Sequence, residues 1–241
     1  MTDPELSQSF VQSSAIAPGR AIWELAPPQA SPSTAVIFLD AEIYLQSVNV
    51  VECIRQLSLD STLPNFTTFF VSNHGQAARS VDFVCNPEYA AFLTQDLIPD
   101  ILQRHESIDP QQLILVGLSL SGLAALHASL LYPDWFQATI CQSPSMWWKN
   151  EAFLERITPA TKRHGKYWIS VGDQETEEDV DHSSANLHQQ TSQLDSCRRT
   201  ADKMKEFGYR VRFEIFSGGH DGPSWSEDLL RALPWALSQP E

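Results

Sequence analysis

The sequence has little positive charge, few cysteines and no long apolar run, and each shortage excludes a class of protein. Sixteen lysine and arginine residues face thirty aspartate and glutamate residues, so the net charge is −14. This charge repels nucleic-acid phosphates and anionic lipids. No stretch of about 18 apolar residues occurs, and the acidic N-terminus does not have the pattern of a secretory signal. We therefore expect a cytoplasmic protein that binds neither nucleic acid nor membranes.

The four cysteines indicate neither a metal site nor a disulfide framework. They lie far apart in a chain of 241 residues, at Cys53, Cys85, Cys141 and Cys197. A chain of this length buries a core without cross-links. We expect free thiols that pack in the interior, and no metal or organic cofactor.

Apolar segments of strand length alternate with helical segments along most of the chain. The expected strands are residues 35–39, 67–71, 113–116, 167–171 and 211–216, with a weaker one at 136–140, and the expected helices are 48–57, 87–104, 121–131, 187–207 and 225–237. Most of the strands are apolar on both faces. The pattern predicts the α/β class, with a doubly wound, mostly parallel sheet and helices on both faces.

The first twenty residues differ in composition from the rest of the chain. They are rich in serine, glutamine and proline without a clear period, which predicts a loosely ordered N-terminal arm or edge structure over residues 1–20. No linker divides the remainder, so we expect residues 21–241 to form a single catalytic domain.

A strand, a tight turn and a helix of small residues carry the clearest chemical signal. Gly117, Ser119 and Gly122 lie where the apolar segment 113–116 runs into the expected helix. This is the context of a nucleophile elbow, which holds a serine in strained geometry at the end of a strand. Ser121 stands where the usual G-x-S-x-G pattern has its second glycine. Taken alone, the segment also fits an ordinary turn with a capping serine.

A serine nucleophile needs a histidine base and an acid, and both follow in the expected chain order. His220 comes directly after the segment 211–216, between glycines, and His74 is the rival with a comparable position. After the segment 167–171, the candidate acids are Asp173, Glu175 and Glu177. Their spacing does not choose among them.

An oxyanion hole requires two backbone N–H groups that face the developing charge. The residue after the nucleophile, Leu120, is the first expected donor. The second is expected from the loop that follows residues 35–39, at Ala41 or Glu42.

Five motifs within residues 35–238 occur in the same order as in a known family. They are residues 38–42, the stretch from Arg79 through residues 92–99, the elbow at 117–125, Ser143-Pro144-Ser145-Met146-Trp147-Trp148 and Gly218-Gly219-His220-Asp221. Together they resemble the enterochelin (siderophore) esterase-like branch of the esterase D group of α/β-hydrolases. The resemblance implies the α/β-hydrolase fold. It also leads us to expect that the chain lacks the separate N-terminal domain of some siderophore esterases.

The resemblance also implies roles for particular residues. Ser119 would be the nucleophile and His220 the base, and Glu175 is favoured as the acid. Arg79 would line the substrate cavity or brace the loop beside it, although the sequence fits a surface ion pair with Asp82 equally well.

Two further features bear on the substrate and the rate. Trp147 and Trp148 would wall a substrate-binding pocket, although core packing explains them as well. Ala41 and Ser121 replace glycines of the family pattern, which predicts slow or narrow activity.

The expected function is that of a serine carboxylic-ester hydrolase whose partner is a small-molecule ester, either of a siderophore or of a small acyl group. The alternatives are an acyltransferase or an S-acyl thioester hydrolase with the same triad, and a catalytically weak binding protein. The sequence does not indicate the oligomeric state.

Overall fold

The computed structural model describes residues 6–27, 31–60, 62–160, 165–182 and 187–238, and every structural statement below refers to them. The strands are β1 (Leu6–Val11), β2 (Arg20–Leu25), β3 (Thr34–Leu39), β4 (Phe66–Val71), β5 (Leu113–Leu118), β6 (Phe136–Gln142), β7 (Lys166–Gly172), β8 (Val180–His182), β9 (Leu187–Gln189) and β10 (Arg210–Phe216). The α-helices are α1 (Ala41–Gln46), α2 (Val50–Leu57), α3 (Gln76–Asp82), α4 (Pro87–Ala91), α5 (Ile98–Arg104), α6 (Ser119–Leu131), α7 (Trp148–Glu151), α8 (Gln193–Glu206) and α9 (Gly222–Leu237). A π-helical turn, η1 (Phe92–Leu97), and a 3₁₀ turn, η2 (Leu154–Arg156), complete the elements.

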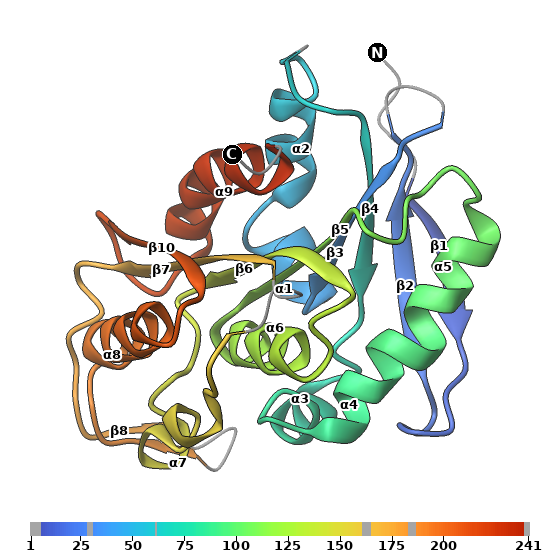
Figure 1. Ribbon diagram of the computed structural model, residues 1–241. Helices are drawn as coiled ribbons and strands as arrows, with labels where there is room; N and C mark the ends of the chain where they lie inside the picture. The colour runs from blue at the N-terminus through green and yellow to red at the C-terminus, as the bar shows by residue number, and fades with distance from the viewer. Residues whose placement is uncertain (1–5, 28–30, 61, 161–164, 183–186, 239–241) are drawn as a thin grey trace.

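One large sheet runs through the molecule (Figure 1). Its strand order is β1-β2-β4-β3-β5-β6-β7-β10. The strands from β4 to β10 in this order are parallel, whereas β2 pairs antiparallel with both of its neighbours. The predicted α/β class with a doubly wound, mostly parallel sheet is confirmed.

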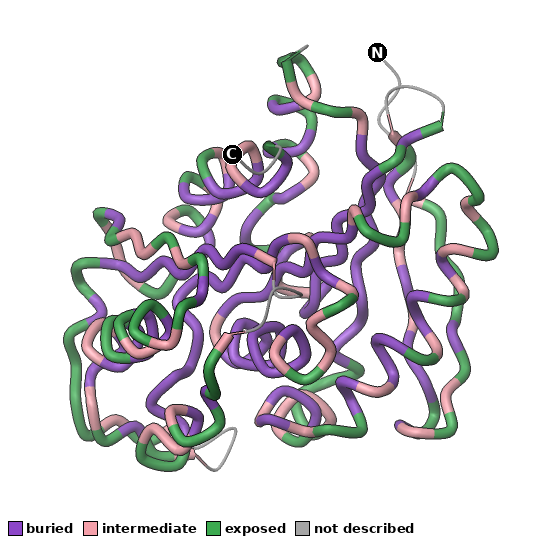
Figure 2. The backbone as a smooth tube through the Cα atoms, viewed as in Figure 1, coloured by how far each residue is buried: buried purple, intermediate pink, exposed green. Residues whose placement is uncertain are grey.

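Each face of the sheet is covered by its own helices. Along β5, Leu113 and Leu115 belong to one apolar core, while Ile114 and Val116 belong to the other. Side chains of a strand alternate between faces, so a strand buried on both sides is apolar throughout. Helices α2 and α9 lie over one face, and α6 and α8 lie over the other (Figure 1). The central strands appear as a buried band between the two layers (Figure 2).

The N-terminal segment contributes the outer strand of the sheet. Residues 6–11 form β1, which pairs antiparallel with β2 along its whole length. Most of its side chains are exposed, which explains why the segment shows no apolar period. The expected edge structure is present here, and a loosely ordered arm does not describe these residues. Residues 1–5 lie outside the described part of the chain.

Two expected helices differ from the observed elements. The helix expected over 87–104 is α4, η1 and α5 in succession, and its π-helical turn lies just before Pro99, a residue that cannot donate a backbone hydrogen bond. The helix expected over 187–207 begins only at Gln193, because Ser192 caps it by accepting a hydrogen bond from the Asp195 amide. Residues 187–189 form β9 instead, which pairs with β8.

The parallel arrangement brings distant residues to one edge of the sheet. The C-terminal ends of β3, β5, β7 and β10 meet there, and these strands are followed in the chain by Asp40, Ser119, Glu175 and His220. In α/β sheets this edge is where ligands bind. Within the described ranges, no helix is long and apolar enough to cross a lipid bilayer.

Candidate active site

The turn between β5 and α6 has the geometry of a nucleophile elbow. Ser119 has a φ of 52°, in the left-handed region that non-glycine residues seldom adopt. The preceding Leu118 is extended and α6 begins at Ser119 itself. The chain therefore reverses sharply at the serine.

Small residues on either side of the serine let the strand and the helix approach closely. A Cβ atom at Gly117 would lie 2.2 Å from the backbone oxygen of Ser121, so only glycine fits. The Ser121 hydroxyl accepts a hydrogen bond from the Leu118 amide at 3.0 Å and donates one to the Leu118 carbonyl at 2.7 Å. Serine at position 121 is therefore compatible with the elbow, because its hydroxyl is fully bonded within the turn.

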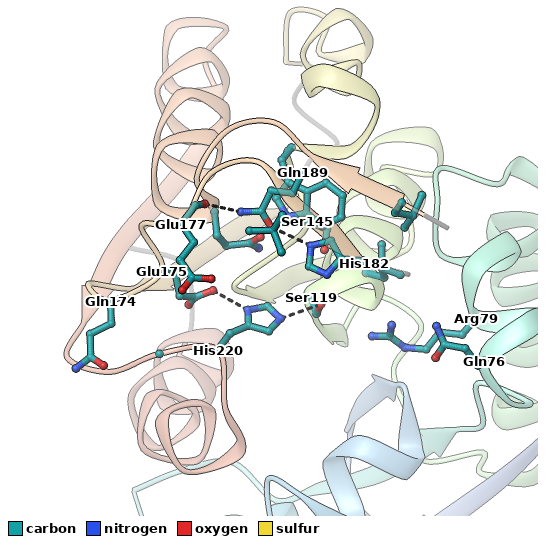
Figure 3. A pocket seen from close by; sticks show the side chains of 16 residues that line it. Gln76, Arg79, Ser119, Ser145, Gln174, Glu175, Glu177, His182, Gln189 and His220 are labelled. Atoms are coloured by element: carbon teal, nitrogen blue, oxygen red, sulfur yellow. Dashed lines mark hydrogen bonds and ion pairs between the residues drawn. The ribbon is translucent and has the colours of Figure 1, made fainter. Parts of the chain in front are cut away.

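Two side chains from different loops meet the serine above this turn (Figure 3). The Nε2 atom of His220 lies 3.0 Å from the Ser119 hydroxyl oxygen. The Nδ1 atom of the same ring lies 2.6 Å from Glu175 Oε2. The structure thus brings together the serine, the histidine and one of the three acids that the sequence left open.

The other two acidic candidates have different surroundings. Asp173 accepts a hydrogen bond from the Gly218 amide at 3.0 Å, and this bond joins the loop after β7 to the loop after β10. Glu177 is exposed and lines the cavity without contacting the His220 ring nitrogens. The rival base His74 is not among the residues that line the cavity.

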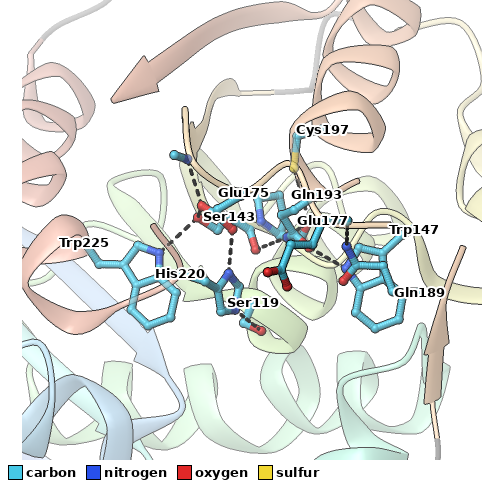
Figure 4. A network of polar contacts seen from close by, with 12 residues as sticks. Ser119, Ser143, Trp147, Glu175, Glu177, Gln189, Gln193, Cys197, His220 and Trp225 are labelled. Carbon is cyan, nitrogen blue, oxygen red and sulfur yellow. Dashed lines mark hydrogen bonds and ion pairs between the residues drawn. The ribbon is translucent and has the colours of Figure 1, made fainter. Parts of the chain in front are cut away.

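A buried network that was not expected from the sequence holds Glu175 (Figure 4). Glu175 Oε1 accepts hydrogen bonds from the Ser143 hydroxyl at 2.5 Å and the Gly172 amide at 2.8 Å. The indole N–H of Trp225 donates to the Ser143 hydroxyl at 3.0 Å. The Trp225 ring also packs edge-on against the His220 ring, with the ring centroids 4.8 Å apart. Trp225 therefore contacts the base directly and the acid through Ser143.

The amide side chain of Gln193 fixes the loop that carries Ser143. It donates to the carbonyls of Ser143 and Pro144, and its oxygen accepts from the Trp147 indole. The Ser-x-Ser-x-Trp-Trp motif, at residues 143–148, had indicated from the sequence that this loop belongs to the family pattern. Nothing in the sequence indicated Gln193, which lies 50 residues away from Ser143.

In the loop after β3, the strained backbone conformation is at Asp40 and not at Ala41. Asp40 has a φ of 70° and Ala41 is the first residue of α1, so alanine is compatible with the backbone there. The Glu42 carboxylate accepts hydrogen bonds from the Ser72 hydroxyl and the Asn73 amide. Of the three expected oxyanion residues, Leu120 lines the cavity, and Ala41 and Glu42 do not.

Arg79 both lines the cavity and braces this loop. Its Nε and Nη2 atoms lie 2.8 and 2.7 Å from Asp40 Oδ2, and Asn73 donates to Oδ1 of the same carboxylate at 2.6 Å. The alternative partner, Asp82, pairs with the buried Arg20 instead. The surface ion pair that the sequence allowed is therefore wrong.

The site opens into a cavity of about 460 Å³ that extends from Ser119 to the β8–β9 hairpin. Trp147 lines it, and its ring stacks on His182 with the centroids 4.9 Å apart. Trp148 does not line the cavity; it is buried, and the Lys149 ammonium lies 4.7 Å from its ring centroid. The hairpin was not expected from the sequence, because two strands of three residues are too short to show a period.

The cysteine near the site is a packing residue. Cys197 is fully buried, its thiol lies 3.2 Å from the Pro144 carbonyl, and burial raises its pKa well above the usual value. A thiol with a raised pKa is a poor nucleophile at neutral pH. All four cysteines are free and buried. In the described part of the chain, no three His, Cys, Asp or Glu side chains are grouped as metal ligands would be.

Comparisons with known proteins identify the family to which the chain is similar. A family described as "Putative esterase" matches residues 23–236. The iron(III) enterobactin esterase of Dickeya dadantii (strain 3937) is 22% identical over 218 residues, which are 84% of this chain and 47% of that protein. The ferri-bacillibactin esterase BesA of Bacillus subtilis (strain 168) is 30% identical over 139 residues, which are 54% of this chain and 44% of that protein. The chain thus spans less than half the length of these relatives.

Solved structures give the same result for the fold. The enterobactin esterase FES from Shigella flexneri, solved in the presence of enterobactin, superposes with a TM-score of 0.80 at 19% identity, over 96% of this chain and 58% of that one. The BES protein from Bacillus cereus superposes with a TM-score of 0.72 at 16% identity, over 99% and 97%. The α/β-hydrolase fold and the resemblance to enterochelin esterases are confirmed.

Proposed function

The chain belongs to the esterase family, and from this premise we propose that it is a serine carboxylic-ester hydrolase that acts through an acyl-enzyme. One observation carries the proposal. His220 lies 3.0 Å from the Ser119 hydroxyl through one ring nitrogen and 2.6 Å from Glu175 through the other. A hydroxyl, an imidazole and a carboxylate in contact in this order are the parts of a catalytic triad.

The proposed reaction follows from which ring nitrogen faces which partner. Glu175 accepts a hydrogen bond from the Nδ1–H group, so Nε2 has a free lone pair directed at Ser119. His220 removes the serine proton as the oxygen attacks the ester carbonyl, and then protonates the departing alcohol. Water, activated by the same ring, attacks the acyl-serine and releases the acid.

The negative charge that develops on the carbonyl oxygen requires donors. We assign the first to the backbone N–H of Leu120, at the start of α6, where helix amides have no partner within the helix. The second stays a prediction at Ala41 or Glu42, in the first turn of α1, because neither residue lines the cavity. One such donor contributes about 3 kcal/mol to the stabilisation of the transition state.

The charges around the cavity favour an uncharged ester. The positive charge of Arg79 is neutralised by Asp40. The cavity is also lined by the negatively charged side chain of Glu177, with which no cation of the described chain pairs. Lys149 lies against Trp148, outside the lining. A ferric catecholate siderophore is anionic, and the lining offers it no unpaired cation. Faster turnover of p-nitrophenyl hemisuccinate than of p-nitrophenyl butyrate would contradict this preference.

Labelling with a fluorophosphonate tests the proposal, because the reagent captures an activated serine. The wild-type protein and Ser121→Ala should both be labelled, and Ser119→Ala should not. Ser121→Ala is a matched control, since it removes a hydroxyl two residues away that is bonded within the turn.

Two results would overturn the proposal. Label that persists in Ser119→Ala and disappears in Ser121→Ala would identify a different nucleophile. A folded wild-type protein that takes up no label and shows no burst with an activated phenyl ester would be a binding protein on a hydrolase scaffold.

A further inference from the structure

One hydroxyl that faces the cavity has no partner in the described chain. Ser145 is 1% exposed and lines the cavity beside Ser119 (Figure 3). Its Oγ atom is buried and forms no hydrogen bond with any described residue. A buried polar group without a partner costs free energy, so native proteins rarely keep one without a reason.

The neighbouring hydroxyls show that this one is an exception. The Ser143 hydroxyl is bonded to Glu175 and Trp225, and the Ser121 hydroxyl is bonded to Leu118 on both sides. Both of these serines are also buried. Of these three serines around the elbow, only Ser145 has its hydroxyl free for a molecule in the cavity.

The backbone holds Ser145 at a fixed position relative to the nucleophile. Its amide donates to the Ser119 carbonyl at 3.0 Å. The preceding residue, Pro144, is held by Gln193 at 2.7 Å. A group bound by the Ser145 hydroxyl would therefore sit at a defined distance from the acyl carbon attached to Ser119.

The wall formed by the β8–β9 hairpin combines polar and apolar groups. His182 stacks on Trp147, and its Nε2 atom lies 3.1 Å from Gln189 Oε1. Val180 and Leu187 line the same region. The cavity therefore offers apolar contact area, with the Ser145 hydroxyl as a hydrogen-bonding point close to the nucleophile.

We propose that Ser145 is a substrate-binding residue whose hydroxyl hydrogen-bonds to an oxygen in the acyl chain, so that the site prefers oxygen-bearing acyl esters to plain alkyl ones. This inference rests on the proposed esterase function. A site that hydrogen-bonds a substrate oxygen discriminates against the analogue without it, because the protein group is then left unpaired.

Two esters that differ in one atom test the inference. In p-nitrophenyl methoxyacetate an ether oxygen replaces a CH₂ group of p-nitrophenyl butyrate. Ser145→Ala should lower kcat/KM for the methoxyacetate about five- to tenfold more than for the butyrate, as expected for the loss of one hydrogen bond. Comparing each ester with itself across variants cancels the difference in their intrinsic reactivity.

Control variants separate binding from structure. Thr200→Val removes another buried, unpaired hydroxyl that does not line the cavity, and it should leave the ratio between the two esters unchanged. Ser145→Ala should not lower the urea midpoint, because its hydroxyl makes no hydrogen bond to the described chain. Ser145→Cys keeps a similar side-chain shape but replaces the hydroxyl with a thiol, which is a weak hydrogen-bond donor. It should show the same selective loss of kcat/KM for the methoxyacetate, and it provides a second test that does not depend on the folding of the alanine variant.

Each remaining outcome counts against the inference. An equal loss on both esters would place Ser145 at the carbonyl or the nucleophile, and no loss in either variant would remove it from the site. If the wild-type protein hydrolyses neither ester, the proposed function itself fails. That result is distinct from hydrolysis without selectivity, which overturns the role of Ser145 alone.

Discussion

At the scale of single residues, the two carboxylate oxygens of Glu175 have separate sets of partners. Oε1 accepts from the Gly172 amide and the Ser143 hydroxyl, and Oε2 faces Nδ1 of His220. Because three donors surround this buried carboxylate, the Glu175 side chain is held in one orientation. Asp173 is closer in sequence to the end of β7, but its carboxylate is bonded to the Gly218 amide.

Replacing Glu175 with glutamine should lower kcat by about 10³- to 10⁴-fold. The backbone N–H of Gly172 has a fixed direction, so the side-chain oxygen of the introduced glutamine must face it. The side-chain NH₂ group must then face His220. The ring is then held in the wrong tautomer. Steady-state hydrolysis of p-nitrophenyl butyrate measures the loss. Asp173→Asn is the control and should cost less than about tenfold; a larger loss there than in Glu175→Gln would reverse the assignment of the acid.

At the scale of elements, the nucleophile depends on how closely β5 approaches α6. The approach is closest at Gly117, whose α-carbon faces the backbone of Ser121 without room for a side chain. On the other side of the turn, Gly122 packs against Pro144. The elbow thus joins the strand, the helix and the loop after β6, which carries both Ser143 and Ser145.

Gly117→Ala should destabilise the protein by about 3 kcal/mol or more, because the new Cβ would lie 2.2 Å from a backbone oxygen that cannot move independently of α6. Urea unfolding measures the stability, and fluorophosphonate labelling reports whether Ser119 is still activated. Ser121→Gly is the comparison: it loses two hydrogen bonds inside the turn and should cost about 1–2 kcal/mol while labelling persists. A Gly117→Ala variant with wild-type stability and labelling would show that the close approach is not required.

At the scale of the whole molecule, a histidine in the core makes the stability of the fold sensitive to acid. His127 lies in α6 and is 4% exposed. Burial, with a smaller contribution from the charge of Arg156, lowers its pKa from 6.5 to about 4. The folded state therefore favours the neutral ring. Between pH 6.5 and 4 the unfolded chain binds the extra proton, so stability falls as the pH falls through this window.

His127→Gln should reduce the loss of stability between pH 7 and pH 4.5. The contribution of His127 over the full window is at most about 3 kcal/mol, from its pKa difference. Urea unfolding at several pH values measures the slope for the variant and the wild type. His188, which is exposed, provides the control: its hydrogen bond with Asp181 raises its pKa, so it stabilises the folded state as the pH falls, and His188→Gln should not reduce the loss of stability. An unchanged slope in His127→Gln would contradict the role of the buried ring.

Local patterns in the sequence predicted the six parallel strands of the sheet, most helices and the turn at Ser119, and chain order indicated His220 as the base, whereas β2 was not predicted. The burial period of a strand or helix is a property of its own few residues, and chain order is read directly from the sequence. The tertiary structure decided what depends on contacts between distant segments. It placed Glu175, which the family resemblance had favoured, against His220 across 45 residues, and it gave Arg79 a partner 39 residues away instead of the nearby Asp82. It also placed Gln193 and Trp225 around the acid. Such contacts are set by strand register and loop path, which no local period encodes.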